Sequence, residues 1–214
     1  ACLWSEGITR IDAVLLSHAD ADHYNALPGL LERFSVGSVF VPPGMLDHRT
    51  RGLQALQDAI RGAKIPIRET WAGDRFSGGE DCRIEVLHPP RRGILGSDNA
   101  NSLVLAIEYL GRRILLMGDL EPPGFDDVLR ELPWHTDVLL APHHGSGASR
   151  PPGLMRWCTP RIVVVSGSAS RDLAQTMAAY RAEKTQVLHT AREGAVHVRM
   201  DEGGLRVATE LRSR

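Results

Sequence analysis

Apolar residues recur along this chain in short runs, and glycine, proline, asparagine or aspartate separates one run from the next. Many of these runs are rich in valine, leucine and isoleucine, which is typical of strands buried within a sheet. The pattern predicts strands at residues 13–17, 39–41, 84–87, 103–109, 113–117, 138–141, 162–166, 186–189, 196–199 and 205–208.

Between these runs, apolar residues recur with helical spacing. Leu53, Leu56 and Ile60 share one face of a predicted helix over residues 53–61. Further helices are predicted over residues 24–34, 126–132 and 173–183. Glycines at 111 and at 203–204 predict the tight turns of two hairpins. Interleaved strands and helices, together with hairpins, predict a mixed α/β fold in which helices cover a sandwich of sheets.

Composition narrows the class of protein. The chain has 214 residues, of which 43% are apolar, enough to build the core of one α/β domain over residues 1–214. The formal charge is −1, so no overall positive field attracts nucleic acid. No apolar run approaches the roughly 20 residues that a membrane span needs. Cys2, Cys82 and Cys158 are widely spaced, so neither a disulfide framework nor a zinc ribbon is indicated.

The segment His18-Ala19-Asp20-Ala21-Asp22-His23 carries the strongest chemical signal. Its four polar residues follow a predicted strand and precede a predicted helix. Side chains on such a turn can converge on one point beside the amides of the helix start. Histidine and carboxylate groups suit zinc, manganese and iron, so the segment predicts a metal site.

Two later strands also end in polar turns. Gly118-Asp119 follows the strand at 113–117, and Pro142-His143-His144-Gly145-Ser146 follows the strand at 138–141. Taken alone, Asp119 could be a helix cap or turn residue, and the two histidines could form a polar turn. Loops at the ends of a rigid sheet are where chemistry is usually placed, so we expect both turns to join the metal site.

The order HxxxDH, strand-GD and strand-His turn resembles the metallo-β-lactamase superfamily. The specific forms HADADH, GDLE and APHHGS, with SHADADHYNALPGLLERF and NANSLVL, resemble the hydrolase-like domain of the ComEC competence proteins, which take up DNA. The resemblance covers nearly the whole chain. It implies an αββα sandwich, a form of α/β fold. Since only 17 residues precede the HxxxDH segment, it also implies a fragment of a longer protein from which the first strands are missing.

The resemblance also implies a binuclear centre that holds two divalent metal ions, Zn or Mn. His18 and Asp20 would bind the first ion, Asp22 and His23 the second, and Asp119 would bridge them. One of His143 and His144 would complete the second site, and the other would lie near the substrate. We expect Asp22, Asp119 and His144 to be the catalytic residues. Because Asp20 stands where many members have histidine, the oxygen-rich first site favours a harder ion such as manganese.

Substrate contacts are predicted around the same turns. Asn101, Ser102 and Ser146 could hydrogen-bond a phosphate, although Asn101 and Ser102 could equally start a strand with an Asx turn. Arg91, Arg92 and Arg150 could contact further phosphates or could be plain surface charges. The loop at 89–98, rich in glycine, proline and arginine, is either a rim over the site or a linker between strands.

The resemblance implies a metal-dependent hydrolase, and we expect a phosphodiesterase or nuclease that acts on DNA during uptake. One alternative is a hydrolase of small or cell-wall phosphodiesters. Another is a non-catalytic domain of a DNA-uptake channel. We expect membrane contact only through parts of the full-length protein outside this sequence, with this domain soluble and extracytoplasmic.

Overall fold

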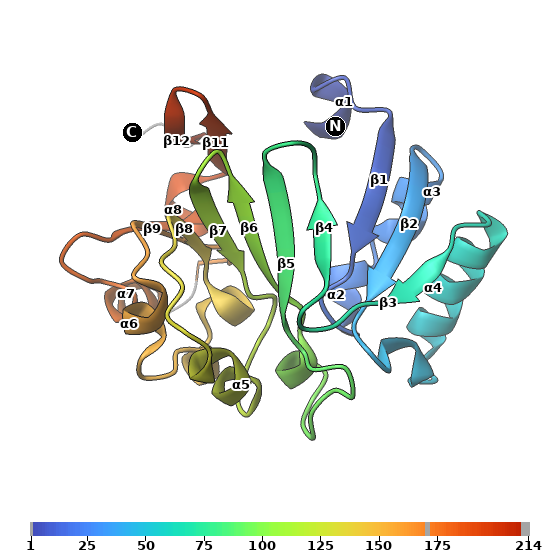
Figure 1. The fold of residues 1–214 in the computed structure, drawn as a ribbon, viewed down its shortest axis with the longest axis horizontal. Coiled ribbons are helices and arrows are strands. Elements are labelled where there is room, and N and C mark those ends of the chain that lie inside the picture. Colours follow the sequence, from blue (N-terminus) through green and yellow to red (C-terminus); the bar gives the residue numbers. More distant parts are fainter. Residues whose placement is uncertain (1, 170–171, 211–214) are drawn as a thin grey trace.

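The computed structural model describes residues 2–169 and 172–210, and it places two facing sheets between helices (Figure 1). The smaller sheet has the order β1-β2-β3, and its neighbouring strands are parallel. Parallel neighbours need crossover connections, and these carry the helices to the outer face of the sheet. The elements are β1 (Arg10–Leu15), α2 (Ala21–Tyr24), α3 (Leu27–Leu31), β2 (Ser35–Val41), η1 (Met45–Asp47), α4 (Arg51–Gly62) and β3 (Ile67–Glu69).

Helix α4 covers this sheet on the right of Figure 1. The side-chain oxygen of Thr50 caps it by accepting a hydrogen bond from the amide of Leu53, at 3.2 Å. The predicted apolar face is present, because Leu53, Leu56 and Ile60 are buried against Val39 in one cluster. The apolar face that the sequence predicts therefore packs α4 against the sheet.

The larger sheet has the order β10-β9-β8-β7-β6-β5-β4. Neighbours are antiparallel from β4 to β7 and parallel from β7 to β10. Leu110 and Gly111 both have positive φ in the β6–β7 turn, the geometry that a two-residue hairpin of matching twist requires. The strands are β4 (Arg75–Ser77), β5 (Cys82–His88), β6 (Val104–Tyr109), β7 (Arg112–Leu116), β8 (Val138–Leu140), β9 (Ile162–Val165) and β10 (Gln186–His189).

The outer face of the larger sheet packs against helices α5 (Gly124–Arg130), α6 (Leu154–Cys158) and α7 (Leu173–Ala179). Phe125, Leu139 and Trp157 belong to this buried cluster. The layers therefore run helix, sheet, sheet, helix, and the predicted αββα sandwich is confirmed. The remaining elements are α1 (Cys2–Ser5), η2 (Asn99–Asn101), η3 (Pro142–Gly145), η4 (Gly147–Ser149), α8 (Thr190–Glu193) and the antiparallel pair β11 (Val196–Asp201) and β12 (Gly204–Thr209).

Differences from the predicted elements have local causes. The helix expected over 24–34 is divided into α2 and α3, and Pro28 stands in the first turn of α3, where its missing N–H costs least. Strands β3 and β4 span three residues each, too short to give a detectable alternation. Helices α1, α6 and α8 were also not predicted, and each spans only four or five residues.

The inner faces of the two sheets meet around a cavity of about 380 Å³. Leucines from both sheets line it, among them Leu15, Leu105 and Leu116, and at its rim stand Ser17, Asp119 and further polar residues. The rim lies at the carboxyl ends of β1 and β7, on the lower side of Figure 1. Within residues 2–169 and 172–210, no helix has the length and apolar character needed to span a membrane.

Candidate metal centre

The first part of the centre comes from the turn after β1. His18 is 1% exposed, and His23 lies on α2 with its ring centre 4.2 Å from that of His18. The hydroxyl oxygen of Ser17 lies 3.0 Å from Nδ1 of both rings. An oxygen with two lone pairs can accept from both Nδ1–H groups, which leaves both Nε2 lone pairs free to bind a cation.

The second part comes from the turn after β7. Gly118 has φ of 51°, and a Cβ added there would lie 3.0 Å from Cβ of Ser17 and 3.1 Å from Cβ of Ser102. Glycine therefore permits this turn to approach the turn that follows β1 in the other sheet. The amide of Asp119 then donates to the hydroxyl oxygen of Ser102 at 3.2 Å, which holds the aspartate in place.

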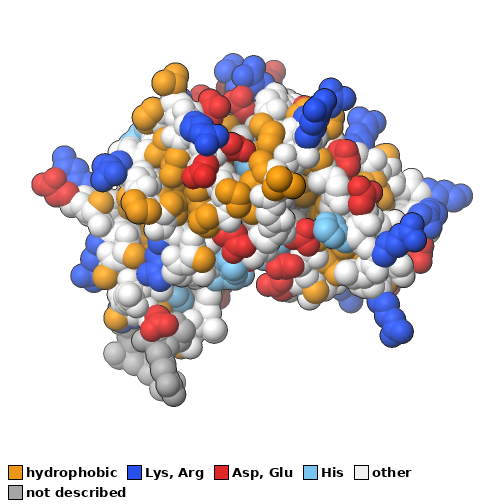
Figure 2. All heavy atoms as spheres, turned by 90° about the horizontal axis from the view of Figure 1, so that it is seen from below, with side chains coloured by type: hydrophobic (Ala, Val, Ile, Leu, Met, Phe, Trp, Pro, Cys, Tyr) orange, Lys and Arg blue, Asp and Glu red, His pale blue; other side chains and the backbone are white. Residues whose placement is uncertain are grey.

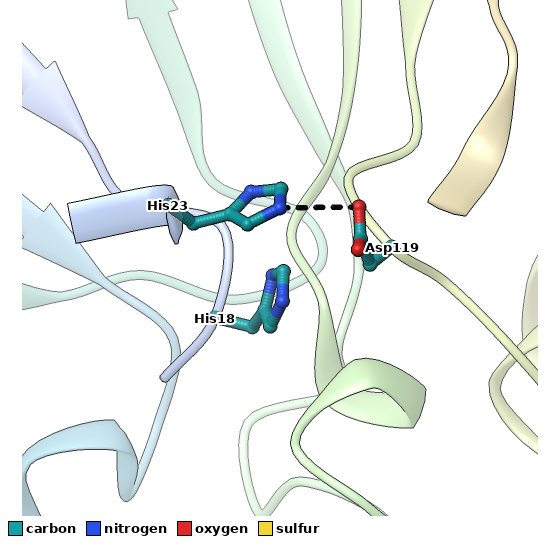
Figure 3. A group of neighbouring side chains, drawn as sticks. All are labelled: His18, His23 and Asp119. Carbon is teal, nitrogen blue, oxygen red and sulfur yellow. Dashed lines mark ion pairs between the residues drawn. The ribbon is translucent and has the colours of Figure 1, made fainter. Parts of the chain in front are cut away.

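Asp119 is the residue at which the two sheets meet. Its carboxylate is almost fully buried, and Oδ1 lies 3.3 Å from Nε2 of His23 (Figure 3). On the other side, Oδ2 lies 3.6 Å from Nε2 of His143 and 3.7 Å from Nε2 of His144. A carboxylate with one oxygen toward each set of histidines has the arrangement expected of a bridging ligand.

The third part is the histidine turn after β8. His143 and His144 have φ of 46° and 54°, a left-handed conformation that is unfavourable for residues other than glycine and that clusters at functional sites. The amide of His143 donates to the carbonyl of Gly118 at 3.0 Å, which joins this turn to the turn of Asp119. Nδ1 of His144 lies 2.8 Å from the carbonyl oxygen of Ser166, so Nδ1 carries the hydrogen. Its Nε2 lone pair is then free and faces Asp119 and Asp22, and Oδ2 of Asp22 lies 3.9 Å from Nε2.

Two groups of ligand atoms result, each with its atoms within 4.8 Å of one another. One group is His18, His23 and Asp119, and the other is Asp22, His23 and His144. Among the described residues, the buried Nε2 of His18 has no hydrogen-bond partner, which fits a lone pair that binds a metal ion. The donor set therefore fits one or two divalent cations of the kind that histidine and carboxylate bind.

Two of the predicted ligands lie beside these groups. Oδ2 of Asp20 lies 3.5 Å from Nε2 of His18, and Nδ1 of His143 lies 3.7 Å from Glu121. In the part of the chain that the structure describes, neither belongs to a three-ligand group. Their roles as ligands stay predictions.

Electrostatics also favour the ligand form of His18. Burial lowers its pKa, the nearby His23 lowers it further, and the carboxylate of Asp119 opposes the shift. The ring is thus neutral near pH 7, as a metal ligand must be.

The predicted substrate residues are placed differently from one another. Ser102 is fully buried beneath Asp119, and its hydroxyl oxygen accepts a hydrogen bond from the amide of Asp119. Asn101 uses both amide hydrogens on the carbonyls of Ile94 and Ser97, and its oxygen accepts from the amide of Ile94. Ser102 therefore supports Asp119, and Asn101 organises the loop at 89–98. Ser146 alone of the three makes no side-chain hydrogen bond within the described residues.

The three candidate arginines also lie in different surroundings. The guanidinium of Arg91 stacks on the ring of Trp71, 4.9 Å from its centre. Arg92 lines a hollow of about 210 Å³ beside His18, so the loop at 89–98 does form a wall next to the centre. Arg150 lines another hollow beside His143 and His144. Figure 2 shows histidine and acidic side chains near the middle of the lower face, while most blue side chains lie toward its edges.

The supporting residues escaped sequence reasoning. Ser17 directly precedes the HADADH segment, so its position was a signal in hindsight, because a hydroxyl beside two histidines can orient them. The carbonyl of Ser166 had no signal, since every residue carries one.

Comparisons with known proteins agree with this geometry. The chain is 29% identical over 202 residues to ComE operon protein 3 of Bacillus subtilis (strain 168) and 28% identical over 207 residues to competence protein ComA of Neisseria gonorrhoeae. These matches cover 92% and 94% of this chain but 26% and 27% of those proteins, so the chain spans about a quarter of their length.

Solved structures show the same fold at low identity. A mutant of the CmlA β-hydroxylase superposes with a TM-score of 0.58 at 13% identity, over 94% of this chain and 45% of that one. The family model described as the β-lactamase superfamily domain matches residues 4–197. The chain therefore belongs to the β-lactamase superfamily domain family, with the metallo-β-lactamase sandwich as its fold and competence proteins among its relatives.

Proposed function

We propose that this chain is a metal-dependent phosphodiesterase that cleaves DNA during uptake. The observation that carries the proposal is the pair of ligand groups that share His23, one of which contains Asp119. His18 and Asp119 would hold one ion, and Asp22, His23 and His144 the other, because the single free lone pair of His23 can bind only one ion; Asp20 and His143 would be neighbouring ligands. When bound, such ions activate water and neutralise charge on a phosphoryl group.

The protein's own residues prepare this chemistry. Ser17 and the carbonyl of Ser166 keep the histidines in the tautomer that leaves Nε2 free. Four carboxylates lie beside the histidines of the centre, and their negative charge would repel an anionic phosphodiester. They belong to Asp20, Asp22, Asp119 and Glu121. Substrate entry therefore depends on bound cations, so both binding and cleavage should be lost with a chelator.

Two features support DNA as the substrate. The relative from Neisseria gonorrhoeae is named a competence protein. In addition, Arg92 and Arg150 line hollows that touch the centre at His18 and at His143 and His144, respectively. Each could contact a backbone phosphate. We propose further that the full-length protein is anchored in a membrane with this domain outside the cytoplasm.

The experiment is cleavage of single- and double-stranded DNA with manganese or zinc. Variants Arg92→Ala and Arg150→Ala are compared with Arg61→Ala, a matched arginine that is exposed on α4 and paired with Asp58. We expect cleavage that a chelator abolishes, and a weaker salt dependence in the first two variants only.

Other outcomes would point elsewhere. Cleavage of small phosphodiesters but not of DNA would favour the small-substrate alternative. DNA binding that is unchanged by chelator, with no cleavage under any metal, would favour a non-catalytic domain and overturn the proposal.

A further inference from the structure

A hollow of about 400 Å³ lies against the histidine turn, on the side of β9 and β10. Its lining includes His143, His144, Ser146, Arg150 and His189. It shares His144 with the cavity between the two sheets. A molecule bound at the centre could therefore extend into this hollow.

His189, the last residue of β10, is the unusual member of this lining. It is 3% exposed, and its Nδ1 accepts a hydrogen bond from the amide of Ala191 at 3.1 Å. The ring hydrogen must then lie on Nε2. Within residues 2–169 and 172–210, Nε2 has no hydrogen-bond partner, although the ring is almost completely buried. Gly167, two residues after β9, faces this ring edge, since a Cβ added there would lie 3.7 Å from Nε2.

The pKa of His189 agrees with a neutral ring. Burial lowers it, and the positive charge of Arg192 lowers it further. Because His189 lines the hollow, its Nε2–H can donate to a ligand or to water there. The side chain is thus a fixed N–H donor held at the wall of the hollow.

Arg150 adds a positive charge to the same hollow. Its Nε donates to the carbonyl of Ser146 at 3.2 Å, which restrains the guanidinium. Among the described residues, no carboxylate forms an ion pair with it, so its terminal nitrogens are available. Asp172 also lines the hollow, but it is exposed to solvent, which screens its charge.

We propose that His189 and Arg150 form a subsite that binds a phosphate adjacent to the one being cleaved. The inference rests on the proposed phosphodiesterase function and refines it. A neutral N–H, a guanidinium and the Ser146 hydroxyl are all donors, and a phosphodiester offers only acceptors. A subsite beside the centre is useful only for a substrate with consecutive phosphates, so the substrate class is a phosphodiester chain rather than an isolated diester.

The variant His189→Asn tests this directly. The side-chain oxygen of asparagine can still accept from the amide of Ala191, but the Nε2 donor is lost. Arg150→Gln removes the charge. His197→Asn is the matched control, because His197 is exposed on β11 and lies beside Glu210 in the separate hairpin.

The substrates are thymidine 5′-p-nitrophenyl phosphate with and without a 3′-phosphate, and thymidine 3′-p-nitrophenyl phosphate with and without a 5′-phosphate. The two pairs cover both directions along a strand. In wild type we expect the extra phosphate to lower KM in one pair. In His189→Asn and in Arg150→Gln that preference should fall by about tenfold, as expected from the loss of one hydrogen bond to a charged group.

A second measurement separates this subsite from the proposed function. Thymidine 3′,5′-bisphosphate, which contains no phosphodiester to cleave, is titrated into the manganese-loaded full chain by calorimetry. Weaker binding by about tenfold in both variants, but not in His197→Asn, would support the subsite even if no substrate is hydrolysed. Unchanged binding and an unchanged preference for the extra phosphate in both variants would overturn it.

Discussion

The two sheets contribute to the metal centre in different ways. The β1-β2-β3 sheet supplies its candidate ligands from six consecutive residues, His18 to His23, and a side chain, the hydroxyl of Ser17, orients two of them. The larger sheet supplies Asp119, His143 and His144 from two separate turns. There, backbone groups hold both histidines: the carbonyl of Gly118 accepts from the backbone amide of His143 and fixes its main chain, and the carbonyl of Ser166 accepts from Nδ1 of His144 and orients that ring.

This difference determines which parts of the centre a single substitution can disturb. A side chain that orients ligands can be removed by one mutation, whereas a carbonyl is kept whatever residue stands there. The larger sheet can rely on backbone groups because β7, β8 and β9 are adjacent and parallel, so that the turns after them meet at one edge. In the smaller sheet, β1 has one paired neighbour among the described residues, the parallel strand β2, and the turn after it, Pro42-Pro43-Gly44, carries no histidine or carboxylate.

The largest effect is expected where the two sheets meet. If Asp119 bridges two ions, Asp119→Asn should lose at least one ion and lower turnover by about 10³-fold or more, because charge in the transition state is no longer stabilised. The fold should persist, since asparagine has nearly the same shape. Metal analysis and turnover of bis-p-nitrophenyl phosphate measure this, with Asp58→Asn on α4 as control. Wild-type turnover in Asp119→Asn would rule out the bridging role.

The next effect tests side-chain against backbone orientation. Ser17→Ala removes the acceptor of both Nδ1–H groups in the smaller sheet, so metal affinity should fall by about 10- to 100-fold. Ser166→Ala keeps its carbonyl and should leave the affinity within about twofold of wild type, since the hydrogen bond to His144 remains. Titration with manganese and zinc measures both. Equal losses in the two variants would contradict the distinction between the sheets.

A smaller effect separates two aspartates of the same segment. Asp22 belongs to a group of three ligand atoms, whereas Asp20 lies beside His18 without joining one. We expect Asp22→Asn to weaken binding of one ion by about tenfold, and Asp20→Asn to weaken it less. Metal titration of the two variants compares them. A larger loss in Asp20→Asn would mean that Asp20 is a ligand of the first ion, as the family resemblance implies.

The smallest effect concerns stability of the larger sheet. His88, fully buried at the end of β5, lies with Nε2 2.8 Å from the carbonyl oxygen of Ala100, and so holds the turn η2. Burial lowers its pKa in the folded state, although this hydrogen bond opposes the shift. The unfolded chain therefore binds the proton first. Stability should be complete above pH of about 6.5 and should fall below it by up to about 1.4 kcal/mol per pH unit until the folded ring also protonates.

The control for this prediction is His88→Gln, which keeps a donor near the Nε2 position but does not titrate. Urea unfolding with chelator, at several values of pH between 5 and 8, compares the two proteins, so that the contributions of other histidines cancel. Parallel pH profiles would show that His88 does not contribute.

Much of the fold was predictable because its causes are local. Valine- and leucine-rich runs predicted β6 to β10 to within about two residues, and the spacing of Leu53, Leu56 and Ile60 predicted α4. The three turns of the candidate centre were predicted for a similar reason, since polar residues stood directly after apolar strands. Short elements such as β3 and α6 form through tertiary pairing and packing, and they left no periodic signal.

The sequence by itself determined which residue types could take part in the chemistry: histidine and aspartate in one segment, and an aspartate and two histidines in two later turns. Only the tertiary structure decided how they combine. It joined Asp22 and His144, some 120 residues apart in the sequence, in one group with His23, buried Ser102 beneath Asp119, stacked Arg91 on Trp71 and brought His189 to the hollow beside His144. The physical reason is that residue type follows from the chain alone, whereas side-chain direction and tautomer depend on neighbours that the folded sheets bring together.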